Sequence, residues 1–393
     1  MTGGRPAHVP GAPLDTVPLD TVPLDTVPLD TVPLDTAGRL PRLVERFDEI
    51  DALVVTRLPN IRYLTGFTGS AGTLVVDADG GSLLCTDGRY AEQSRRQVED
   101  AGVGTQIEIA VTVAETHAAV ANHLSDRRRV GLEAHGLTWA AQRGYAEAFG
   151  PDRDLVATEG LVEALRRRKD PGEIARIAAA CAIADEAFGV VRERLGDGFT
   201  EREIALDLEF EMRRRGATAV SFDPIVASGP NGAMPHARPS DRTVRHGELV
   251  VCDFGCIVDG YCSDMTRTVS VGPPDQRSRD LYTLVASAQA AGAAAVAPGV
   301  DLIAVDAAAR TPIVDAGYGE QFSHGTGHGV GIEVHEAPRV ARTSSGTLQV
   351  GDVITVEPGV YLPGIGGVRV EDTLAVTEEG ADTLTNSPKE LIL

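Results

Sequence analysis

The 393-residue chain lacks any apolar run that approaches the ~20 consecutive residues of a membrane-spanning helix. Its first residues also lack the apolar core of a secretory signal. An excess of positive charge is missing as well, since 36 Lys and Arg residues face 57 Asp and Glu residues, for a formal net charge of −21. Nucleic-acid binding needs clustered Lys and Arg. We therefore expect a cytoplasmic protein with neither a nucleic-acid nor a membrane partner.

Cysteines are few and odd in number: Cys85, Cys181, Cys252, Cys256 and Cys262. An odd count in a long chain argues against a disulfide framework. Three of the five crowd one short segment, but their spacing fits no familiar zinc knot, and cysteine is among the most buried residue types. We expect free, structural thiols.

The N-terminal segment is a low-complexity repeat. From Pro13 onward it contains five tandem five-residue units, four PLDTV and a final PLDTA. Proline at every fifth position excludes a regular helix, and one small apolar pair per unit cannot build a core. We expect residues 1–36 to form a disordered tail. The alternative is a tail that docks to a partner.

Two domains are expected after the tail. Residues 37–160 alternate helix and strand patterns, with an apolar strand at 52–56 and a hairpin turning at 77–81, which predicts a small α/β domain. Residues 161–393 mix alanine-rich helices with antiparallel hairpins, which predicts an α+β domain. The first domain offers no catalytic constellation.

Helix starts in the second domain are marked by capping patterns. Asp170 precedes Pro171 and Glu173, the pattern of a capping box with proline at the first helical position. Thr200 and Glu203 predict the start of another helix in the same way. These signals place long helices on both sides of residue 200.

A turn signal positions two aspartates. Asp259-Gly260 is the strongest short hairpin signal, and strand-forming residues flank it. A two-residue turn there sets Asp264 opposite Gly255, with Asp253 two positions further along on the same face. Such diagonal neighbours lie ~7–8 Å apart, and we expect Gly255 to leave the space between them open. A bulge would change this register.

A second hairpin positions two glutamates. Glu357 and Glu371 are symmetric about Gly364 in the turn-rich PGIGG, so a hairpin there sets them nearly opposite. A lone acidic residue is more often a solvated one. Like charges that face each other on a sheet are destabilising, so two acidic hairpins in one segment indicate bound cations.

A histidine- and glycine-rich run, FSHGTGHGVGIEVHE, lies between these hairpins and contains His328. Its alternate glycines make a helix implausible, which excludes an HExxH zinc peptidase. Glycine also permits close approach of backbone or substrate. Four carboxylates and one imidazole form a hard, oxygen-rich ligand set that suits Mn²⁺ or a similar divalent ion better than a Zn²⁺–thiolate site.

At these residues the chain resembles the "pita-bread" metallopeptidases, which include aminopeptidase P, prolidase and methionine aminopeptidase, with metal-free creatinase as a relative. The stretches NIRYLTGFTGSAGTLVV and TDGRY resemble the N-terminal domain of aminopeptidase P and prolidase. The resemblance implies a pita-bread catalytic domain after a creatinase-type α/β domain. It also implies that the first domain serves oligomer contacts, so that a homodimer or higher homo-oligomer is expected.

The resemblance assigns the metal ligands one by one. Asp253 would chelate one ion, His328 and Glu357 would hold the other, and Asp264 and Glu371 would bridge the two. The expected cofactors are two divalent ions, Mn²⁺ first, with Co²⁺ or Zn²⁺ as alternatives.

The resemblance also implies catalytic and substrate-binding roles. Glu357 would double as general base, while His335 and His236 would stabilise the developing oxyanion. His236 matches the family's substrate-binding histidine, in a GxNGxxPH setting. His324 is a candidate for a contact to a metal-ligating residue or to a substrate amide. Arg369 would orient the metal ligand beside it and help to bind substrate.

Specificity for proline is the least direct inference. We expect a small-peptide substrate and release of the N-terminal residue from peptides with proline second, as an Xaa-Pro aminopeptidase. The alternative is an Xaa-Pro dipeptidase, which reads proline's free carboxylate with a cation, and only Arg238 and Arg369 stand near the motifs for that task. A more distant alternative is a metal-free binding module or creatinase-like enzyme, which would be expected to have lost ligands.

Overall fold

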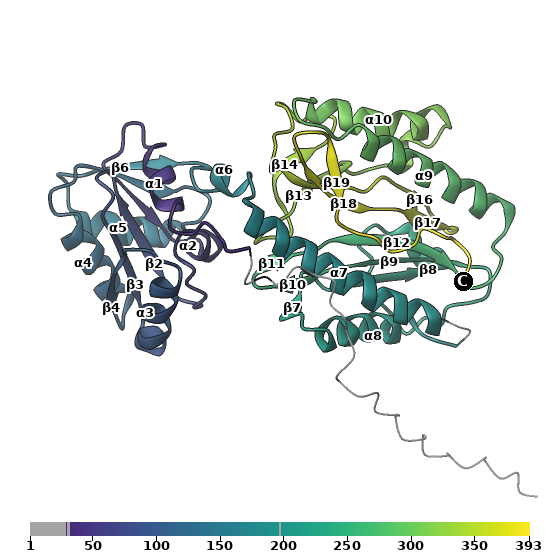
Figure 1. Cartoon of the computed structure of the whole chain (residues 1–393), viewed down its shortest axis with the longest axis horizontal. Helices are drawn as coiled ribbons and strands as arrows, with labels where there is room; N and C mark the ends of the chain where they lie inside the picture. The colour runs from purple at the N-terminus through teal and green to yellow at the C-terminus, as the bar shows by residue number, and fades with distance from the viewer. Residues whose placement is uncertain (1–28, 30–31, 196–197) are drawn as a thin grey trace, which may run out of the picture.

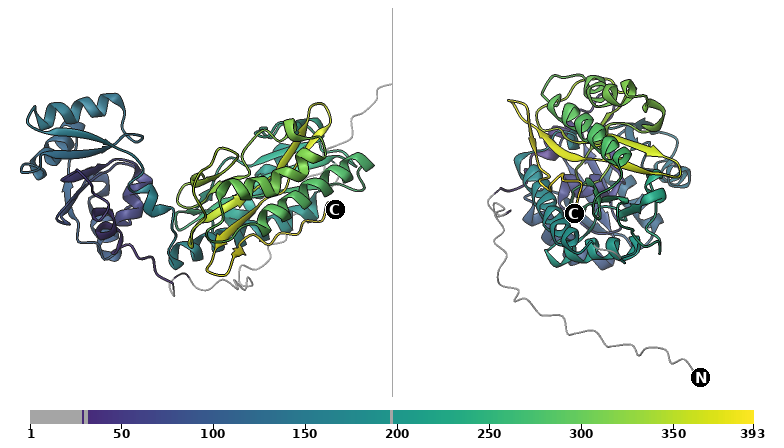
Figure 2. Two further views of the ribbon diagram at one scale, coloured as in Figure 1. Left: turned by 90° about the horizontal axis from the view of Figure 1, so that it is seen from above. Right: turned by 90° about the vertical axis from the view of Figure 1, so that its right-hand side faces the viewer.

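The structure, a computed structural model, describes residues 29, 32–195 and 198–393. Two bodies lie side by side along the long axis, the N-terminal domain in purple and blue and the larger domain in teal to yellow (Figure 1). The view from above in Figure 2 shows them joined through a narrower region near α6 (Glu163–Arg166) and the start of α7 (Pro171–Arg194). Among the described residues, no helix has both the length and the apolar character needed to cross a bilayer.

The N-terminal domain is built on one mixed sheet of six strands, in the order β4-β3-β2-β1-β5-β6. The expected strand is β1, and the expected hairpin is β2–β3 with its turn after Asp77. The elements in chain order are α1 (Arg39–Val44), β1 (Ala52–Val55), α2 (Leu58–Thr65), β2 (Thr73–Asp77), β3 (Ser82–Thr86), α3 (Ala91–Asp100), β4 (Gln106–Ile109), α4 (Val113–His123), β5 (Arg129–Glu133), α5 (Trp139–Phe149) and β6 (Asp154–Thr158).

The larger domain places strands between two pairs of helices (Figure 1). One pair is α7 and α8 (Glu201–Arg214), and the other is α9 (Gln276–Ala294) and α10 (Leu302–Asp315). Both predicted capping boxes are present, at Asp170 for α7 and at Thr200 for α8. The strands are β7 (Ala219–Val220), β8 (Ile225–Ser228), β9 (Leu249–Phe254), β10 (Cys256–Val258), β11 (Tyr261–Cys262), β12 (Met265–Ser270), β13 (Gly327–Gly329), β14 (Glu336–Val340), β15 (Val353–Val356), β16 (Gly359–Leu362), β17 (Gly366–Arg369), β18 (Asp372–Val376) and β19 (Ala381–Thr383).

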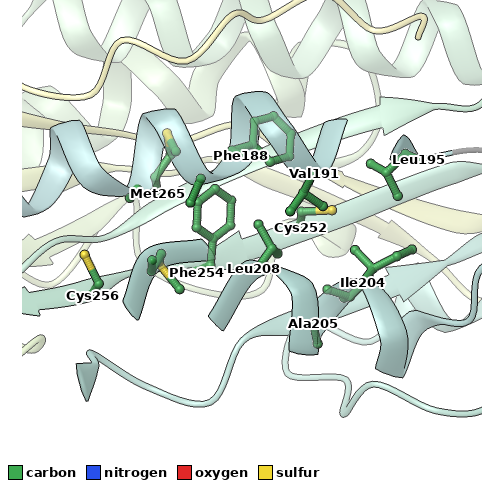
Figure 3. Close-up of a cluster of buried hydrophobic side chains, with 14 of the residues drawn as sticks. Phe188, Val191, Leu195, Ile204, Ala205, Leu208, Cys252, Phe254, Cys256 and Met265 are labelled. Atoms are coloured by element: carbon green, nitrogen blue, oxygen red, sulfur yellow. The ribbon is translucent and has the colours of Figure 1, made fainter. Parts of the chain in front are cut away.

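Strand β9 separates an apolar face from a charged one. Phe254 and Cys252 point toward α7 and α8 and pack with Phe188 and Leu208 in one buried cluster (Figure 3). Because side chains alternate across a strand, Asp253 between them faces the other way. All five cysteines are free and buried, as predicted.

Both predicted hairpin registers are confirmed. Asp259 and Gly260 have φ of 44° and 81°, the two left-handed residues of a type I′ turn. The register of this turn continues into β9 and β12, where Thr266 faces Asp253. Around Gly364, β16 pairs with β17, and the same symmetry continues where β15 pairs with β18. Glu357 and Glu371 therefore leave the hairpin at matching positions.

The expected role of Gly255 is corrected. A Cβ at this position would lie 1.9 Å from the carbonyl oxygen of Ser263, so the glycine admits the facing backbone rather than leaving open space between carboxylates. The glycines of the histidine-rich run behave alike. A Cβ on Gly327 would meet the Thr355 carbonyl at 1.9 Å, because β13 and β15 pass very close together.

The end of the predicted tail belongs to the folded body. Thr36 is buried, and Leu34 packs partly buried against the cluster that contains Ile177 and Tyr261. The expectation of disorder is therefore wrong for residues 32–36. The remainder of the predicted tail, residues 1–28 and 30–31, lies outside the described residues.

Candidate metal centre

The two aspartates converge on one face of the first hairpin. Asp253 at the end of β9 and Asp264 just before β12 are both buried. One oxygen of Asp253, Oδ2, accepts a hydrogen bond of 2.5 Å from Nη2 of Arg369. The other, Oδ1, is buried with no hydrogen-bond partner among the described residues. A buried, unpartnered carboxylate oxygen is costly unless a cation occupies the site.

His328 in β13 presents one nitrogen to the carboxylates. Its Nδ1 donates to the carbonyl oxygen of Gly329 at 3.1 Å. Since a carbonyl only accepts, Nδ1 carries the proton, and the lone pair of Nε2 is free. Nε2 lies 3.6 Å from Oδ2 of Asp264 and 3.4 Å from Oε1 of Glu357. Burial lowers the pKa of His328 to about 4, so the ring stays neutral, as a metal ligand requires.

The two glutamates complete the site. Donor atoms of Asp264, His328 and Glu371 lie within 4.8 Å of one another. Glu357 joins this group through its contact with His328. Burial raises the pKa of Glu357 to about 8, and it raises the pKa of Asp264 and Glu371 well above their ordinary values, with repulsion among the carboxylates as a further cause. Hard oxygen donors, one free imidazole nitrogen and this excess of buried negative charge fit divalent cations.

Arg369 contacts one carboxylate directly and reaches its neighbour Glu371 through another side chain. It bonds Asp253 directly, and its Nε donates to Oγ1 of Thr266 at 3.0 Å. That hydroxyl in turn donates to Oε2 of Glu371 at 2.6 Å. Arg369 therefore orients one ligand directly and the other through Thr266. Sequence reasoning missed Thr266, because its role depends on which strand lies beside β12.

His324 is joined to Arg369 by a second hydrogen-bonded chain. Its Nδ1 donates to the Gly325 carbonyl at 2.8 Å, so its Nε2 accepts from the hydroxyl of Tyr361 at 2.9 Å. The Tyr361 oxygen accepts from Nη1 of Arg369 at 2.8 Å. Burial lowers the pKa of His324 to about 4. Both ring nitrogens of His324 are thus engaged within the protein.

All nine predicted site residues line a single cavity of about 660 Å³. His236 and His335 are the exposed members, and their ring nitrogens make no hydrogen bond to the part of the chain that the structure describes. The ring centroid of His335 lies 4.3 Å from that of His328, at an interplanar angle of 72°. The cavity therefore has buried carboxylates at its base and two accessible imidazoles on its walls.

The loop that carries His335 is held by the N-terminal domain. Arg57, at the start of α2, contacts both carboxylate oxygens of Glu333, at 2.8 and 2.9 Å. Arg166 contacts Glu333 at 2.8 Å and also Glu336. Although burial alone would raise the pKa of Glu336, Lys169 and Arg166 hold it below its ordinary value. Two carboxylates that flank His335 are thus fixed by Arg57 of the N-terminal domain and by Arg166 of the connecting helix α6.

A cation that sequence reasoning missed also lines the cavity. Arg339 in β14 is exposed, and its Nε would lie 3.8 Å from a Cβ placed on Gly325. The expectation that Arg238 and Arg369 are the only nearby cations is therefore wrong. No spacing signal could have found Arg339, because it reaches the cavity through the pairing of β13 with β14.

Comparison with known proteins identifies the family. Residues 175–378 match Metallopeptidase family M24, and residues 39–168 match the Creatinase/Prolidase N-terminal domain. The chain belongs to metallopeptidase family M24. It is therefore a peptidase of the metal-dependent hydrolase class, on the pita-bread fold that was expected.

Both dipeptidase and aminopeptidase names occur among the similar proteins. A Pyrococcus furiosus relative named Xaa-Pro dipeptidase is 35% identical over 90% of this chain and 99% of its own length. The solved Xaa-Pro dipeptidase from Bacillus anthracis is 40% identical, with a TM-score of 0.86 over 91% of this chain and 100% of that one. The X-Pro aminopeptidase from Thermotoga maritima is 34% identical, with a TM-score of 0.81 over 89% and 99%.

Proposed function

We propose that this M24 enzyme is an Xaa-Pro dipeptidase that hydrolyses the bond before proline in dipeptides. The exposed guanidinium of Arg339 on the cavity wall carries this proposal. A dipeptide ends in a carboxylate one residue beyond the cleaved bond, and arginine binds carboxylates through paired, charge-assisted hydrogen bonds. The names of the Pyrococcus and Bacillus relatives support this specificity.

In this proposal, the buried residues of the cavity bind metal and transfer a proton. Asp253, Asp264, His328, Glu357 and Glu371 would hold two divalent ions, with Mn²⁺ as the first candidate. When bound, such ions polarise the substrate carbonyl and lower the pKa of a water molecule. Glu357 would take a proton from the attacking water at its carboxylate and pass it to the leaving proline nitrogen.

The exposed imidazoles act on the substrate itself. His335 and His236 donate hydrogen bonds to the carbonyl oxygen as negative charge develops on it. Each such donor contributes roughly 10²–10³ in rate in other hydrolases. Arg369, buried and fully engaged, keeps Asp253 in place rather than contacting the peptide.

The second candidate is the Xaa-Pro aminopeptidase favoured by sequence analysis. The Thermotoga neighbour supports it. That preference rested on the first-domain stretches FTGSAGTLVV and TDGRY, which resemble aminopeptidase P slightly better than prolidase, and on the lack of a further cation near the motifs. Arg339 supplies such a cation. An aminopeptidase would leave room beyond proline, where Arg339 would meet a neutral peptide group.

The deciding experiment compares kcat/KM on Ala-Pro, on Ala-Pro amide and on Ala-Pro-Ala, for the wild type, Arg339→Ala and the control Arg238→Ala. We expect the wild type to prefer Ala-Pro. Arg339→Ala should lose about 10–100-fold on Ala-Pro through a higher KM, as for a charged hydrogen bond, and change little on the amide. Faster hydrolysis of Ala-Pro-Ala by the wild type would establish the aminopeptidase instead.

The proposal extends to assembly and location. We propose a homodimer or higher homo-oligomer, which light scattering of the metal-loaded enzyme would test. Five free, buried thiols support a reducing compartment such as the cytoplasm.

A further inference from the structure

The last repeat unit, residues 33–37, packs against a surface formed by Asp170, Gly172 and Arg176 at the start of α7 and by Arg42 of α1, which we name the groove. Nη1 of Arg176 in α7 donates to the carbonyl oxygen of Val32 at 3.1 Å. The amide of Asp35 donates to Oδ2 of Asp170 at 3.3 Å, and Asp35 pairs with Arg42 of α1 at 2.6 Å. The unit therefore touches the first helix of each domain.

The groove accommodates both the backbone of the repeat unit and its leucine side chain. A Cβ on Gly172 in the first turn of α7 would lie 2.3 Å from the carbonyl oxygen of Pro33, so only glycine there lets the unit lie on the helix. Leu34 supplies the apolar contact, and Thr36 is buried. The pair Asp35–Arg42 is exposed and contributes little, as surface ion pairs do.

Every contact that residues 33–36 make to the groove involves a residue type that all five units share. Proline, leucine, aspartate and threonine recur in each unit, and valine precedes Pro33 as it precedes the upstream prolines from Pro18 onward. The fifth position is the one that differs, with alanine in the last unit and valine in the others. Ala37 at that position is exposed, so a valine fits there.

We propose that this groove is a binding site for a Pro-Leu-Asp-Thr peptide and that the tandem units are interchangeable occupants of it. The last unit is favoured because two hydrogen bonds join it to the start of α1: Gly38 donates to Oδ1 of Asp35 at 3.3 Å, and Arg39 donates to the Thr36 carbonyl at 3.1 Å. If the preceding unit bound in place of the last one, the five residues of the last unit would form a longer loop before α1. Lengthening a surface loop in this way costs little.

The test uses the full chain and its melting temperature. One variant carries Leu34→Asp alone. A second carries Asp at the four upstream leucines, Leu14, Leu19, Leu24 and Leu29, and a third carries all five substitutions. We expect the first two to melt within about 1 °C of the wild type, because an intact unit fills the groove, and the third to melt several degrees lower.

Two helix substitutions serve as controls. Gly172→Ala blocks the groove for every unit and should lower the melting temperature as the five-fold variant does. Gly189→Ala in the same helix has no atom within 4 Å of the added Cβ and should not lower it. If Leu34→Asp alone melts as low as the five-fold variant, the units do not exchange. If the five-fold variant melts like the wild type, the groove holds no unit, and either result overturns the proposal.

Discussion

At the scale of single residues, the site concentrates acidic side chains in a buried position. Asp264 and Glu371 are buried, and Glu357 lies within contact distance of His328. Carboxylates so placed either hold protons or bind cations. The unpartnered Oδ1 of Asp253 and the free Nε2 of His328 favour cations.

The first prediction concerns the ligands themselves. Glu357→Gln and Asp264→Ala should each lower bound Mn²⁺, measured by elemental analysis after gel filtration, and reduce kcat by roughly 10²–10⁴-fold or more, since a ligand and, at Glu357, a proton carrier are lost. Glu379→Gln, at an exposed position, is the matched control. Wild-type turnover by either ligand variant would refute the metal centre.

The second prediction concerns pH in the absence of metal. The folded-state pKa of Glu357 is about 8, above the ordinary value of 4.5, so the folded chain holds a proton that the unfolded chain releases in this interval. The contribution of protonated Glu357 to the free energy of unfolding is therefore fully present below pH 4.5 and is lost as the pH rises to about 8. Chelator-treated protein should therefore melt at progressively lower temperature from pH 5 to 8.

Metal should reverse that trend, because ligands must lose protons to bind it. With saturating Mn²⁺, the melting temperature should rise relative to the chelated protein, most strongly at pH 8. Glu357→Gln should flatten the curve of the chelated protein. A melting temperature that rises with pH after chelation would contradict the protonation of buried carboxylates.

At the scale of elements, two hairpins bring the acidic residues together. Turn chemistry was sufficient to predict both: Asp259-Gly260 takes left-handed φ values, and Gly364 takes φ of 76° at the second turn. Side-chain alternation then fixes which face carries the carboxylates.

Other parts of the site depend on tertiary contacts and left no local signal. Thr266 acts through a hydroxyl that meets Arg369 only after β12 has packed beside the hairpin of β16 and β17. Arg339 reaches the cavity because β13 pairs with β14, with an irregular register that periodicity does not announce. The packing of Leu34 was missed because a repeat of low complexity has no amphipathic pattern.

The third prediction tests the first hairpin as a unit. Gly255→Ala would force a Cβ to within 1.9 Å of the Ser263 carbonyl, which must displace the segment that carries Asp264. We expect a loss of about 1–3 kcal/mol in the free energy of unfolding, as for other overpacked sites, together with weaker metal binding. Denaturant titration measures the first and elemental analysis the second. An unchanged variant would show that the hairpin has more room than its geometry indicates.

At the scale of the whole molecule, the two domains meet next to the site. Arg57 and Arg166 reach from the N-terminal domain and the connecting helix to Glu333 and Glu336, on either side of His335. The paired contacts of Arg57 with Glu333 are partly buried, with side-chain exposures of 27% and 33%. The N-terminal domain thus determines where a proposed oxyanion donor stands, although it lines none of the cavity.

The fourth prediction follows from this link. Arg57→Ala should reduce kcat by roughly 10–100-fold through misplacement of His335, since small errors of position are costly in catalysis. Bound Mn²⁺ should stay unchanged, because Arg57 contacts none of the ligands. Arg57→Lys retains the positive charge but cannot contact both carboxylate oxygens of Glu333 in the same way. Its kcat should therefore lie between that of the wild type and that of Arg57→Ala. The double variant Arg57→Ala/His335→Ala tests whether Arg57 acts through His335. If it does, the double variant should have the same kcat as His335→Ala alone. Additive losses in the double variant would assign Arg57 another role.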